Sequence, residues 1–453
     1  MKKTRFFSIF LLAVLLAGLA APGASALTEP EIQCQAALLM DMETGAVIYA
    51  KNEHQEMYPA SLTKIMTALL VLEAVEDGRL SMDQKITVSA TSLLGLPEDG
   101  STAGIQAGEI MTVEEILYCM LIVSANEACV ILAEAVSGSA DSFVEAMNAK
   151  AEVLDCQNTH FVNPHGLHDP RHYTSAWDMY LITQEALTHE EFLTICDTRE
   201  ITIPATNLSE PRILRNTNYL ISPWKTRGYL NSDAHGVKTG STSEAGHCLV
   251  STALRGSLSF LSVVLNGDRR TLEDGEIRTY SFYDTNQLFR WGIENFAYQT
   301  VLKAKDPVQE VPVSLSKQDW VTVRPAHDVD VLLPNDLPPE DLEREITLLS
   351  ETAEAPIAEG DVLGSLTLSY HDKEYATVDL LAMSSVEASR SQVFIRDAKL
   401  FLEQPWVRIS AIAAAALILL LIIWKTFFSR RRYRYGRSVS RRGSRGSYRG
   451  RRR

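Results

Sequence analysis

A serine and a lysine three residues apart, Ser61 and Lys64, are the first residues that could carry out chemistry. Good helix formers follow them, and residues i and i+3 of a helix share a face, so the lysine amine can reach the serine hydroxyl. A serine hydroxyl is a weak nucleophile until a base takes its proton, and a partly buried lysine near a second cation has a lowered pKa that suits it as that base. The pair predicts a nucleophile and its base at a helix N-terminus. The structural alternative is a serine N-cap, and one residue can play both roles.

Two further segments supply polar groups that such a nucleophile needs. Ser124 and Asn126 interrupt an apolar helical stretch, and Lys238, Thr239 and Gly240 begin a strand pattern. Ser124 could pass a proton to a leaving amine, and Asn126 could donate to a substrate carbonyl or hold the lysine base. Lys238 and Thr239 could bind a carboxylate, while Gly240 leaves room for a substrate backbone beside the strand. Taken singly, each segment is better explained as a polar loop or a surface strand end than as part of a catalytic site. Because all of the segments occur together in one chain, a catalytic site is the favoured interpretation.

The elements that must position these residues follow from the hydrophobic pattern. A turn between two apolar runs, 36–41 and 46–50, predicts a β-hairpin. Helices are expected at 61–74, 113–136 with a break at 124–126, 142–154, 176–187 and 279–296. A loop is expected at 157–174, and strands are expected from 236–240 and at 246–253 and 258–266. This order predicts an α+β domain over 27–297, in which helices pack on an antiparallel sheet.

The pattern of apolar and turn-forming residues changes from about Tyr298. Short strand-like runs broken by Pro, Gly and Asp predict a separate small β domain over 298–383, with strands at 311–315, 320–323, 329–333, 345–349, 363–370 and 374–381. A connector at 384–408 follows, in which residues such as Val393 and Phe401 could form one apolar stripe.

The two ends of the chain predict export and membrane anchorage. Residues 1–26 combine a basic start, an apolar run and a small-x-small site, which is typical of a cleaved secretory signal peptide rather than an anchor helix. Residues 409–428 are long and apolar enough to span a bilayer. The tail 429–453 holds twelve Arg and no acid, so it should remain cytoplasmic while the body lies outside. The tail could bind anionic lipid or nucleic acid, although a stop-transfer role accounts for it more simply.

The charge of the body argues against nucleic acid as its partner. Residues 27–407 carry all 57 acidic residues but only 26 of the 43 basic ones, so their net charge is −31. A surface so acidic repels a phosphate backbone.

The cysteines and histidines give no metal pattern. The six cysteines have no zinc-type spacing; they could form disulfides in an exported protein or remain buried thiols. Four histidines cluster at positions 160, 165, 168 and 172 without an acid at metal-ligand spacing, so a metal site is the weaker interpretation.

The three short segments together resemble the motif set of penicillin-recognising serine enzymes. More closely, the chain resembles the low-molecular-weight penicillin-binding proteins that are serine D-alanyl-D-alanine carboxypeptidases of peptidase family S11. The resemblance covers about residues 33–385 and rests on YPASLTKIMTAL, LIVSANEACVILAE, THFVNPHGLHDPRHYTSAWDM, RNTNYLI and GVKTGSTSEAG, with APIAEGDVLG in the β domain. It implies a β-lactamase/DD-peptidase-like catalytic domain followed by the family's C-terminal β domain.

The resemblance also implies roles for individual residues. Ser61 would form the acyl-enzyme, Lys64 would accept its proton and Ser124 would complete the triad. Lys238 would bind the substrate carboxylate, and the backbone N–H groups of Ser61 and Ser241 would form the oxyanion hole. Asn126, Thr239 and Gly240 would contact the substrate.

The reaction implied is removal of the terminal D-alanine from peptidoglycan stem peptides, with β-lactams as covalent inhibitors and no metal or organic cofactor. The chain departs from the pattern at Glu127, where the family commonly has Asp, and in its full membrane span, where many relatives use an amphipathic anchor helix. Two rival functions remain. A β-lactamase would share the three motifs but would also need a deacylating Glu, for which Glu210 and Asn216 are poorly spaced. A non-enzymatic peptidoglycan-binding protein would not need the intact Ser61, Lys64, Ser124 and Lys238, so these residues argue against it.

Overall fold

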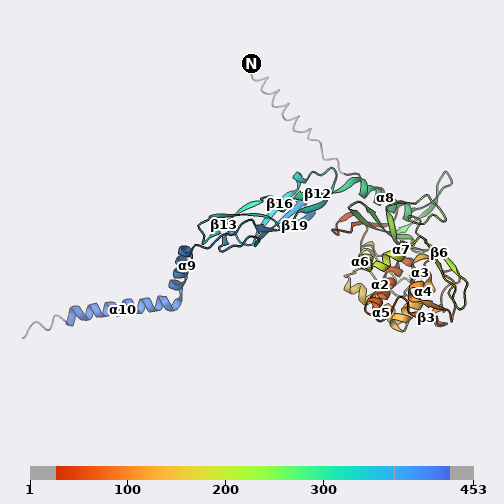
Figure 1. Cartoon of the computed structure of the whole chain (residues 1–453), viewed down its shortest axis with the longest axis horizontal. Coiled ribbons are helices and arrows are strands. Elements are labelled where there is room, and N and C mark those ends of the chain that lie inside the picture. Colours follow the sequence, from red (N-terminus) through yellow and green to blue (C-terminus); the bar gives the residue numbers. More distant parts are fainter. Residues whose placement is uncertain (1–26, 372, 429–453) are drawn as a thin grey trace, which may run out of the picture. The chain divides into compact units, whose positions relative to one another are not determined.

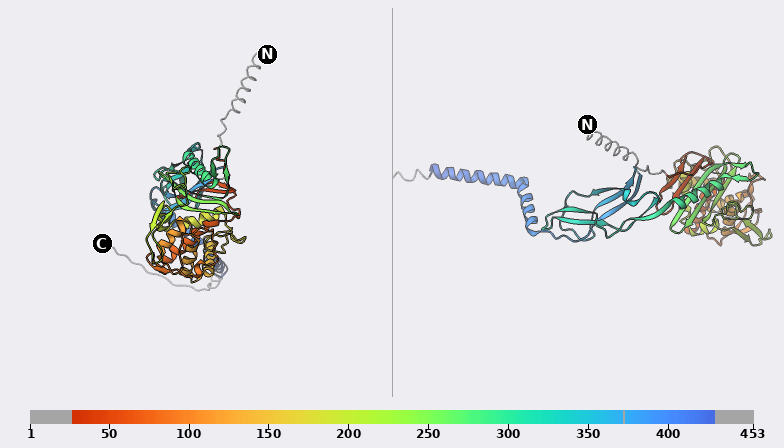
Figure 2. Two further views of the ribbon diagram at one scale, coloured as in Figure 1. Left: turned by 90° about the vertical axis from the view of Figure 1, so that its right-hand side faces the viewer. Right: turned by 90° about the horizontal axis from the view of Figure 1, so that it is seen from above.

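The computed structural model describes residues 27–371 and 373–428 (Figures 1 and 2). The predicted signal peptide and the arginine-rich tail lie outside these residues. The chain divides into two compact units. The first extends to Val301 and includes Asp330–Glu343 and Leu368–Ala376, and the second contains Leu302–Val329, Arg344–Thr367 and the residues from Thr377 onward.

The first unit is built on a five-stranded antiparallel sheet. Its order is β2-β1-β9-β8-β7, with β1 at Ala36–Asp41, β2 at Val47–Lys51, β7 at Ala234–Thr242, β8 at Gly246–Arg255 and β9 at Leu258–Gly267. Side chains of a strand alternate between its two faces. In β1, therefore, Leu38 and Met40 enter one buried apolar cluster, while Ala37 and Leu39 enter another on the opposite face. This is why the predicted hairpin begins with an almost unbroken apolar run.

Helices cover both faces of this sheet. The larger cluster contains side chains of α2 (Thr63–Glu76), α3 (Val113–Ile122), α4 (Asn126–Ser137), α5 (Ala140–Val153), α6 (Ala176–Ala186) and α7 (Glu190–Cys196). The smaller cluster contains side chains of α8 (Tyr280–Asn295). The α+β prediction is confirmed, and the helix break at 124–126 separates α3 from α4.

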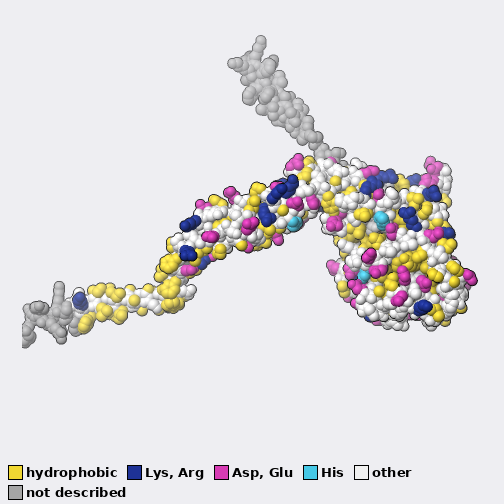
Figure 3. Space-filling model, viewed as in Figure 1, with side chains coloured by type: hydrophobic (Ala, Val, Ile, Leu, Met, Phe, Trp, Pro, Cys, Tyr) yellow, Lys and Arg dark blue, Asp and Glu magenta, His cyan; other side chains and the backbone are white. Residues whose placement is uncertain are grey.

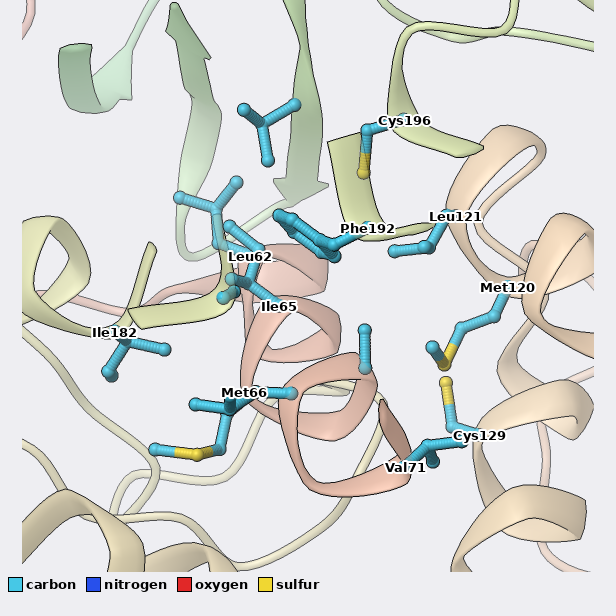
Figure 4. Close-up of a cluster of buried hydrophobic side chains, with 14 of the residues drawn as sticks. Leu62, Ile65, Met66, Val71, Met120, Leu121, Cys129, Ile182, Phe192 and Cys196 are labelled. Atoms are coloured by element: carbon cyan, nitrogen blue, oxygen red, sulfur yellow. The ribbon is translucent and has the colours of Figure 1, made fainter. Parts of the chain in front are cut away.

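Helix α2 runs through the centre of the larger cluster. In Figure 4, Ile65, Met66 and Val71 project from it among side chains of the surrounding helices. Eleven of its fourteen residues are buried, and a helix that is apolar nearly all round is a core helix. The lysine of the first motif therefore starts inside the core, which fixes its position and removes it from water.

Several short elements were not expected from the sequence. They are the 3-10 helices η1 (Ala60–Leu62), η2 (Thr91–Leu93) and η3 (Pro339–Asp341), helix α7, and three two-stranded sheets formed by β3 (Lys85–Thr87) with β4 (Ile110–Thr112), β5 (Glu200–Ile203) with β6 (Arg212–Arg215), and β10 (Arg269–Thr271) with β11 (Ile277–Thr279). Short strands of three or four residues give little periodicity.

The later part of the chain is rich in strands, as expected. Strand β12 (Phe296–Leu302) pairs with β15 (Val329–Pro334). A six-stranded sheet has the order β16-β18-β19-β14-β13-β17, with β13 at Gln309–Ser314, β14 at Trp320–Pro325, β16 at Glu343–Leu348, β17 at Ala353–Glu354, β18 at Val362–Tyr370 and β19 at Lys373–Ala382. Each of the six predicted runs overlaps a strand, and β12 and β17 are additional.

The chain ends in two consecutive helices. The expected connector contains α9 (Arg390–Glu403), and α10 (Pro405–Phe428) begins four residues before the expected span. The segment Pro405–Phe427 is long and apolar enough to cross a membrane, with a mean hydropathy of 2.5 and none of it buried. Its surface is covered by hydrophobic side chains (Figure 3).

Candidate active site

The three sequence motifs meet at one cleft in the first unit. Ser61 lies in η1, Ser124 lies in the turn between α3 and α4, and Thr239–Ser241 lie in β7. These residues line a cleft of about 630 Å³, a volume typical of small-molecule sites. Asn126 and the two lysines of the motifs are not among the lining residues and are buried.

Lys64 is held directly against Ser61. Its Nζ donates to Ser61 Oγ at 2.9 Å, to Asn126 Oδ1 at 2.9 Å and to the backbone carbonyl of His165 at 2.7 Å. The side chain is fully buried, and burial lowers its pKa from the ordinary value of 10.5. A neutral amine therefore becomes accessible at lower pH, as a proton acceptor for Ser61 requires. Of the two roles suggested for Asn126, the structure shows the one that holds the lysine.

Ser61 is not a helix cap. The residues that precede η1 and α2 are Pro59 and Leu62, and neither helix has a side-chain cap hydrogen bond at its N-terminus. The hydroxyl of Ser61 is thus free of the structural role that was its alternative and faces the cleft.

The backbone carbonyl of His165 was not anticipated as part of the site. It belongs to the Asn-Pro-His-Gly turn, in which Asn163 Oδ1 accepts from the N–H of Gly166 at 2.7 Å. Gly166 has φ +86°, and a Cβ there would lie 1.8 Å from the carbonyl oxygen of Ala60. Only glycine permits this turn to lie against η1, so the turn places the carbonyl that completes the shell of the lysine amine.

Ser124 is strained and unpaired. Its φ is 65°, and its buried Oγ has no hydrogen-bond partner among the described residues. A non-glycine residue at positive φ costs about 1 kcal/mol or more, and an unsatisfied buried hydroxyl is also unfavourable. Because Ser124 lines the cleft beside Ser61, a substrate or leaving group could satisfy this hydroxyl.

Glu127 forms hydrogen bonds that connect the loop at 102–103 to the second motif. Its carboxylate accepts from Thr102 Oγ1 at 2.6 Å and from the N–H of Ala103 at 2.7 Å. The N–H of Asn126 also donates to the carbonyl of Ser101 at 2.9 Å, and Ser101 lines the cleft. The acid that departs from the family resemblance, Glu127, thus makes hydrogen bonds at this position.

Lys238 is more deeply placed than the sequence suggested. Its side chain is 1% exposed, and its Nζ donates to the carbonyl of Thr239 at 2.9 Å. Burial, and then the positive charge of Lys64, lower the pKa of Lys238 to about 7. Thr239 lines the cleft, and its Oγ1 lies 2.6 Å from Thr217 Oγ1. A ligand in the cleft would therefore contact Thr239 directly, whereas the charge of the buried Lys238 would act on it from behind the cleft wall.

Gly240 brings the strand against the nucleophile. A Cβ at this position would lie 2.9 Å from the carbonyl oxygen of Pro59 and 3.2 Å from the backbone nitrogen of Ser61. The next residue, Ser241, lines the cleft. The N–H groups expected to form an oxyanion hole thus belong to two segments that a glycine allows to approach closely.

The clustered histidines have structural contacts. His172 Nε2 lies 2.8 Å from Thr63 Oγ1, and His168 packs edge-on against Tyr58. Burial lowers the pKa of His165 to about 3 and that of His172 to about 4. No group of three or more residues able to hold a metal ion occurs within 27–371 and 373–428.

All six cysteines are free thiols in the structure. Of the two alternatives that the sequence left open, disulfides and free thiols, the structure therefore has the thiols.

The fold and this cleft are those of a penicillin-binding serine hydrolase. The family model for D-alanyl-D-alanine carboxypeptidase (peptidase S11) matches residues 24–269, and the model for the C-terminal domain of penicillin-binding protein 5 matches residues 296–388. The chain belongs to the S11 family of D-alanyl-D-alanine carboxypeptidases.

Individual relatives support this assignment over most of the chain. D-alanyl-D-alanine carboxypeptidase DacF of Bacillus subtilis (strain 168) is 32% identical over 371 residues, which are 80% of this chain and 88% of the relative. DacA of Haemophilus influenzae is 30% identical over 363 residues, 79% of this chain and 86% of the relative. The crystal structure of penicillin binding protein 5 from Haemophilus influenzae matches with a TM-score of 0.63 at 29% identity, covering 80% of this chain and all of that chain. The protein is accordingly a DD-carboxypeptidase of cell wall metabolism.

Proposed function

We propose that Ser61 attacks the carbonyl of the penultimate D-alanine of a peptidoglycan stem pentapeptide. Lys64 accepts the hydroxyl proton, the Ser61 ester forms, and the terminal D-alanine leaves with a proton delivered through Ser124. Water then hydrolyses the ester and regenerates the serine. The same attack on a β-lactam ring gives a covalent penicillin adduct.

The other cleft residues position the substrate in this proposal. Asn126 holds the proton acceptor, and Thr239 and Lys238 attract the terminal carboxylate, the first by contact and the second by its charge. Gly240 lets the peptide lie along β7, and the N–H groups of Ser61 and Ser241 stabilise the oxyanion.

The observation that carries the proposal is the buried Lys64 amine at 2.9 Å from Ser61 Oγ. The test is release of D-alanine from a stem pentapeptide by the full chain in detergent, followed by mass spectrometry. Ser61→Ala should abolish release, whereas Ser243→Ala, an exposed serine five residues beyond the lysine of β7, should retain it. Release by the Ser61 variant would refute the assignment of the nucleophile.

The rival activity, β-lactam hydrolysis, finds less support in the cleft. Its described lining contains no Asp or Glu that could act as a fast deacylating base. Glu210 is exposed and does not line it, and Asn216 instead donates to the carbonyls of Cys196 and Thr198. Labelling by a fluorescent penicillin with negligible nitrocefin turnover would support the peptidase and exclude both rivals.

The proposed layout places the catalytic domain outside the membrane. We assign 1–26 as the signal peptide, 27–297 as the catalytic domain, 298–383 as the β domain, 384–408 as the connector, 409–428 as the span and 429–453 as a cytoplasmic tail. The apolar exposed helix α10 supports a membrane anchor. Protease added to intact protoplasts should digest the body and spare a small C-terminal piece, and a C-terminal epitope accessible from outside would contradict this topology.

A further inference from the structure

A strap formed by residues 89–103 follows β3 and reaches the cleft at Ser101. The cleft end of the strap is held by Glu127 of α4, whose Oε1 accepts from both Thr102 Oγ1 and the N–H of Ala103. Glu127 is only 4% exposed, so loss of these two hydrogen bonds would leave the strap without a partner that water easily replaces. The carboxylate therefore fixes where this end of the strap lies.

The far end of the strap is held by a second acid of the same helix. Glu134 Oε2 accepts from Ser89 Oγ at 2.8 Å and from Ser92 Oγ at 2.6 Å. Glu134 follows Glu127 by seven residues, so the two acids lie on one face of α4, about 10 Å apart along the helix. Both acids thus hold the strap, but only Glu127 does so beside the second catalytic motif.

The cleft end of the strap contacts Asn126, the residue that holds the proton acceptor. The N–H of Asn126 donates to the carbonyl of Ser101 at 2.9 Å, and a Cβ on Gly100 would lie 3.0 Å from Asn126 Nδ2. Asn126 Oδ1 in turn accepts from Lys64 Nζ at 2.9 Å. A series of contacts therefore runs from the carboxylate of Glu127, through the strap and Asn126, to the amine of the general base.

We propose that Glu127 is a positioning residue for acylation, which fixes the strap so that Asn126 holds Lys64 in place. The inference rests on the proposed function, because acylation is the step that it affects. The two hydrogen bonds, not the charge, carry this role: burial lowers the pKa of Lys64, and the charge of Glu127 acts in the opposite direction. A neutral side chain that keeps the accepting oxygen should therefore serve as well.

The test compares Glu127→Ala, Glu127→Gln and Glu134→Ala in the full chain in detergent, by the rate of acylation by a fluorescent penicillin and by Tm. Both alanine variants lose hydrogen bonds to the strap and should have a lower Tm. Only Glu127→Ala should slow acylation, by about tenfold or more, because a small displacement of a catalytic group is costly. Glu127→Gln should restore most of the rate, since its one amide oxygen can accept both bonds that Oε1 accepts.

Three outcomes of this comparison would overturn the inference. The first is a Glu127→Ala chain that is acylated at the wild-type rate. The second is equal slowing in Glu134→Ala, which would show that the overall stability of the strap matters and not its cleft end. The third is a Glu127→Gln chain as slow as Glu127→Ala, which would show that the charge matters and not the hydrogen bonds.

Hydrogen exchange of the same chains tests the positioning without any turnover. Glu127→Ala should speed exchange at the amides of Ala103 and Asn126, whereas Glu134→Ala should speed it at Ser92, whose N–H donates to Ser89 Oγ. A wild-type chain that penicillin does not acylate would refute the proposed function. Unchanged exchange at Ala103 and Asn126 in Glu127→Ala would instead overturn the positioning role, so the two failures are distinguishable.

Discussion

Replacing Lys238 by methionine should stabilise the catalytic domain at pH 7 while impairing its reaction. The pKa of this lysine falls from 10.5 in the unfolded chain to about 7 in the fold, so burial of its charge costs about 4 kcal/mol at pH 7. Methionine has a similar shape and no charge. Its substitution loses one hydrogen bond to the carbonyl of Thr239, worth about 1 kcal/mol, and repacking costs about 1 kcal/mol. A net gain of about 2 kcal/mol remains.

The assay is scanning calorimetry of the full chain in detergent, following the unfolding transition of the catalytic domain. A gain of about 2 kcal/mol raises the Tm of a domain of this size by about 4–8 °C. The folded-state pKa lies below the unfolded value, so the penalty is complete below pH 7 and disappears as pH rises towards 10.5. The gain in Tm of Lys238→Met over wild type should therefore shrink above pH 7 and reverse sign by about pH 10, where the remaining penalty is smaller than the ~2 kcal/mol lost in hydrogen bonding and repacking.

The exposed Lys85 supplies the control, because Lys85→Met should shift Tm little at either pH. A Lys238→Met chain that is less stable than wild type at pH 7, or a Tm difference independent of pH, would refute the reasoning. The same variant should lose more turnover on a free-carboxylate substrate than on its amidated analogue, and equal losses would show that the lysine acts on the catalytic groups instead.

Two more predictions concern the reaction itself. Gly240→Ala should reduce acylation at least about a hundredfold, because its Cβ would lie 3.2 Å from the Ser61 nitrogen and crowd the proposed oxyanion hole. Stopped-flow penicillin acylation, with far-UV circular dichroism to check the fold, measures this, and unchanged acylation would contradict it. The value of kcat/KM should fall as pH rises through about 7, where Lys238 loses its charge, while burial lowers the pKa of Lys64 and so extends the pH range in which this proton acceptor is neutral; a profile that keeps rising to pH 10 would contradict it.

The sequence predicts most of the helices and strands whose apolar residues recur with a regular period. The apolar run of β1, the central helix that follows Ser61, and the helix break that contains Ser124 each appear as strong local signals and are found in the structure. The motifs also meet at one cleft as expected, since their residue types and order carry the information. Helix α10 was predicted because an uninterrupted apolar run of this length is typical of a bilayer-spanning helix.

What the sequence does not predict depends on contacts between distant segments. The carbonyl of His165 reaches Lys64 from a residue 101 positions away, and a backbone atom leaves no signature in residue type. The glycine at position 166 was the one available signal, because a turn rich in Asn, Pro and Gly marks an unusual backbone. The burial of Lys238 could not be foreseen either, since a lysine at a strand start is usually exposed.

Mass spectrometry of the penicillin adduct tests the central claim most directly. Full-length protein in detergent is incubated with benzylpenicillin, quenched, digested with trypsin and sequenced by fragmentation. The penicilloyl mass should appear on the peptide spanning residues 52–64, in which Ser61 is the sole serine, and should be absent from the Ser61→Ala protein. An adduct on any other residue, or an equally stable adduct in the variant, would contradict the assignment of Ser61 as the nucleophile.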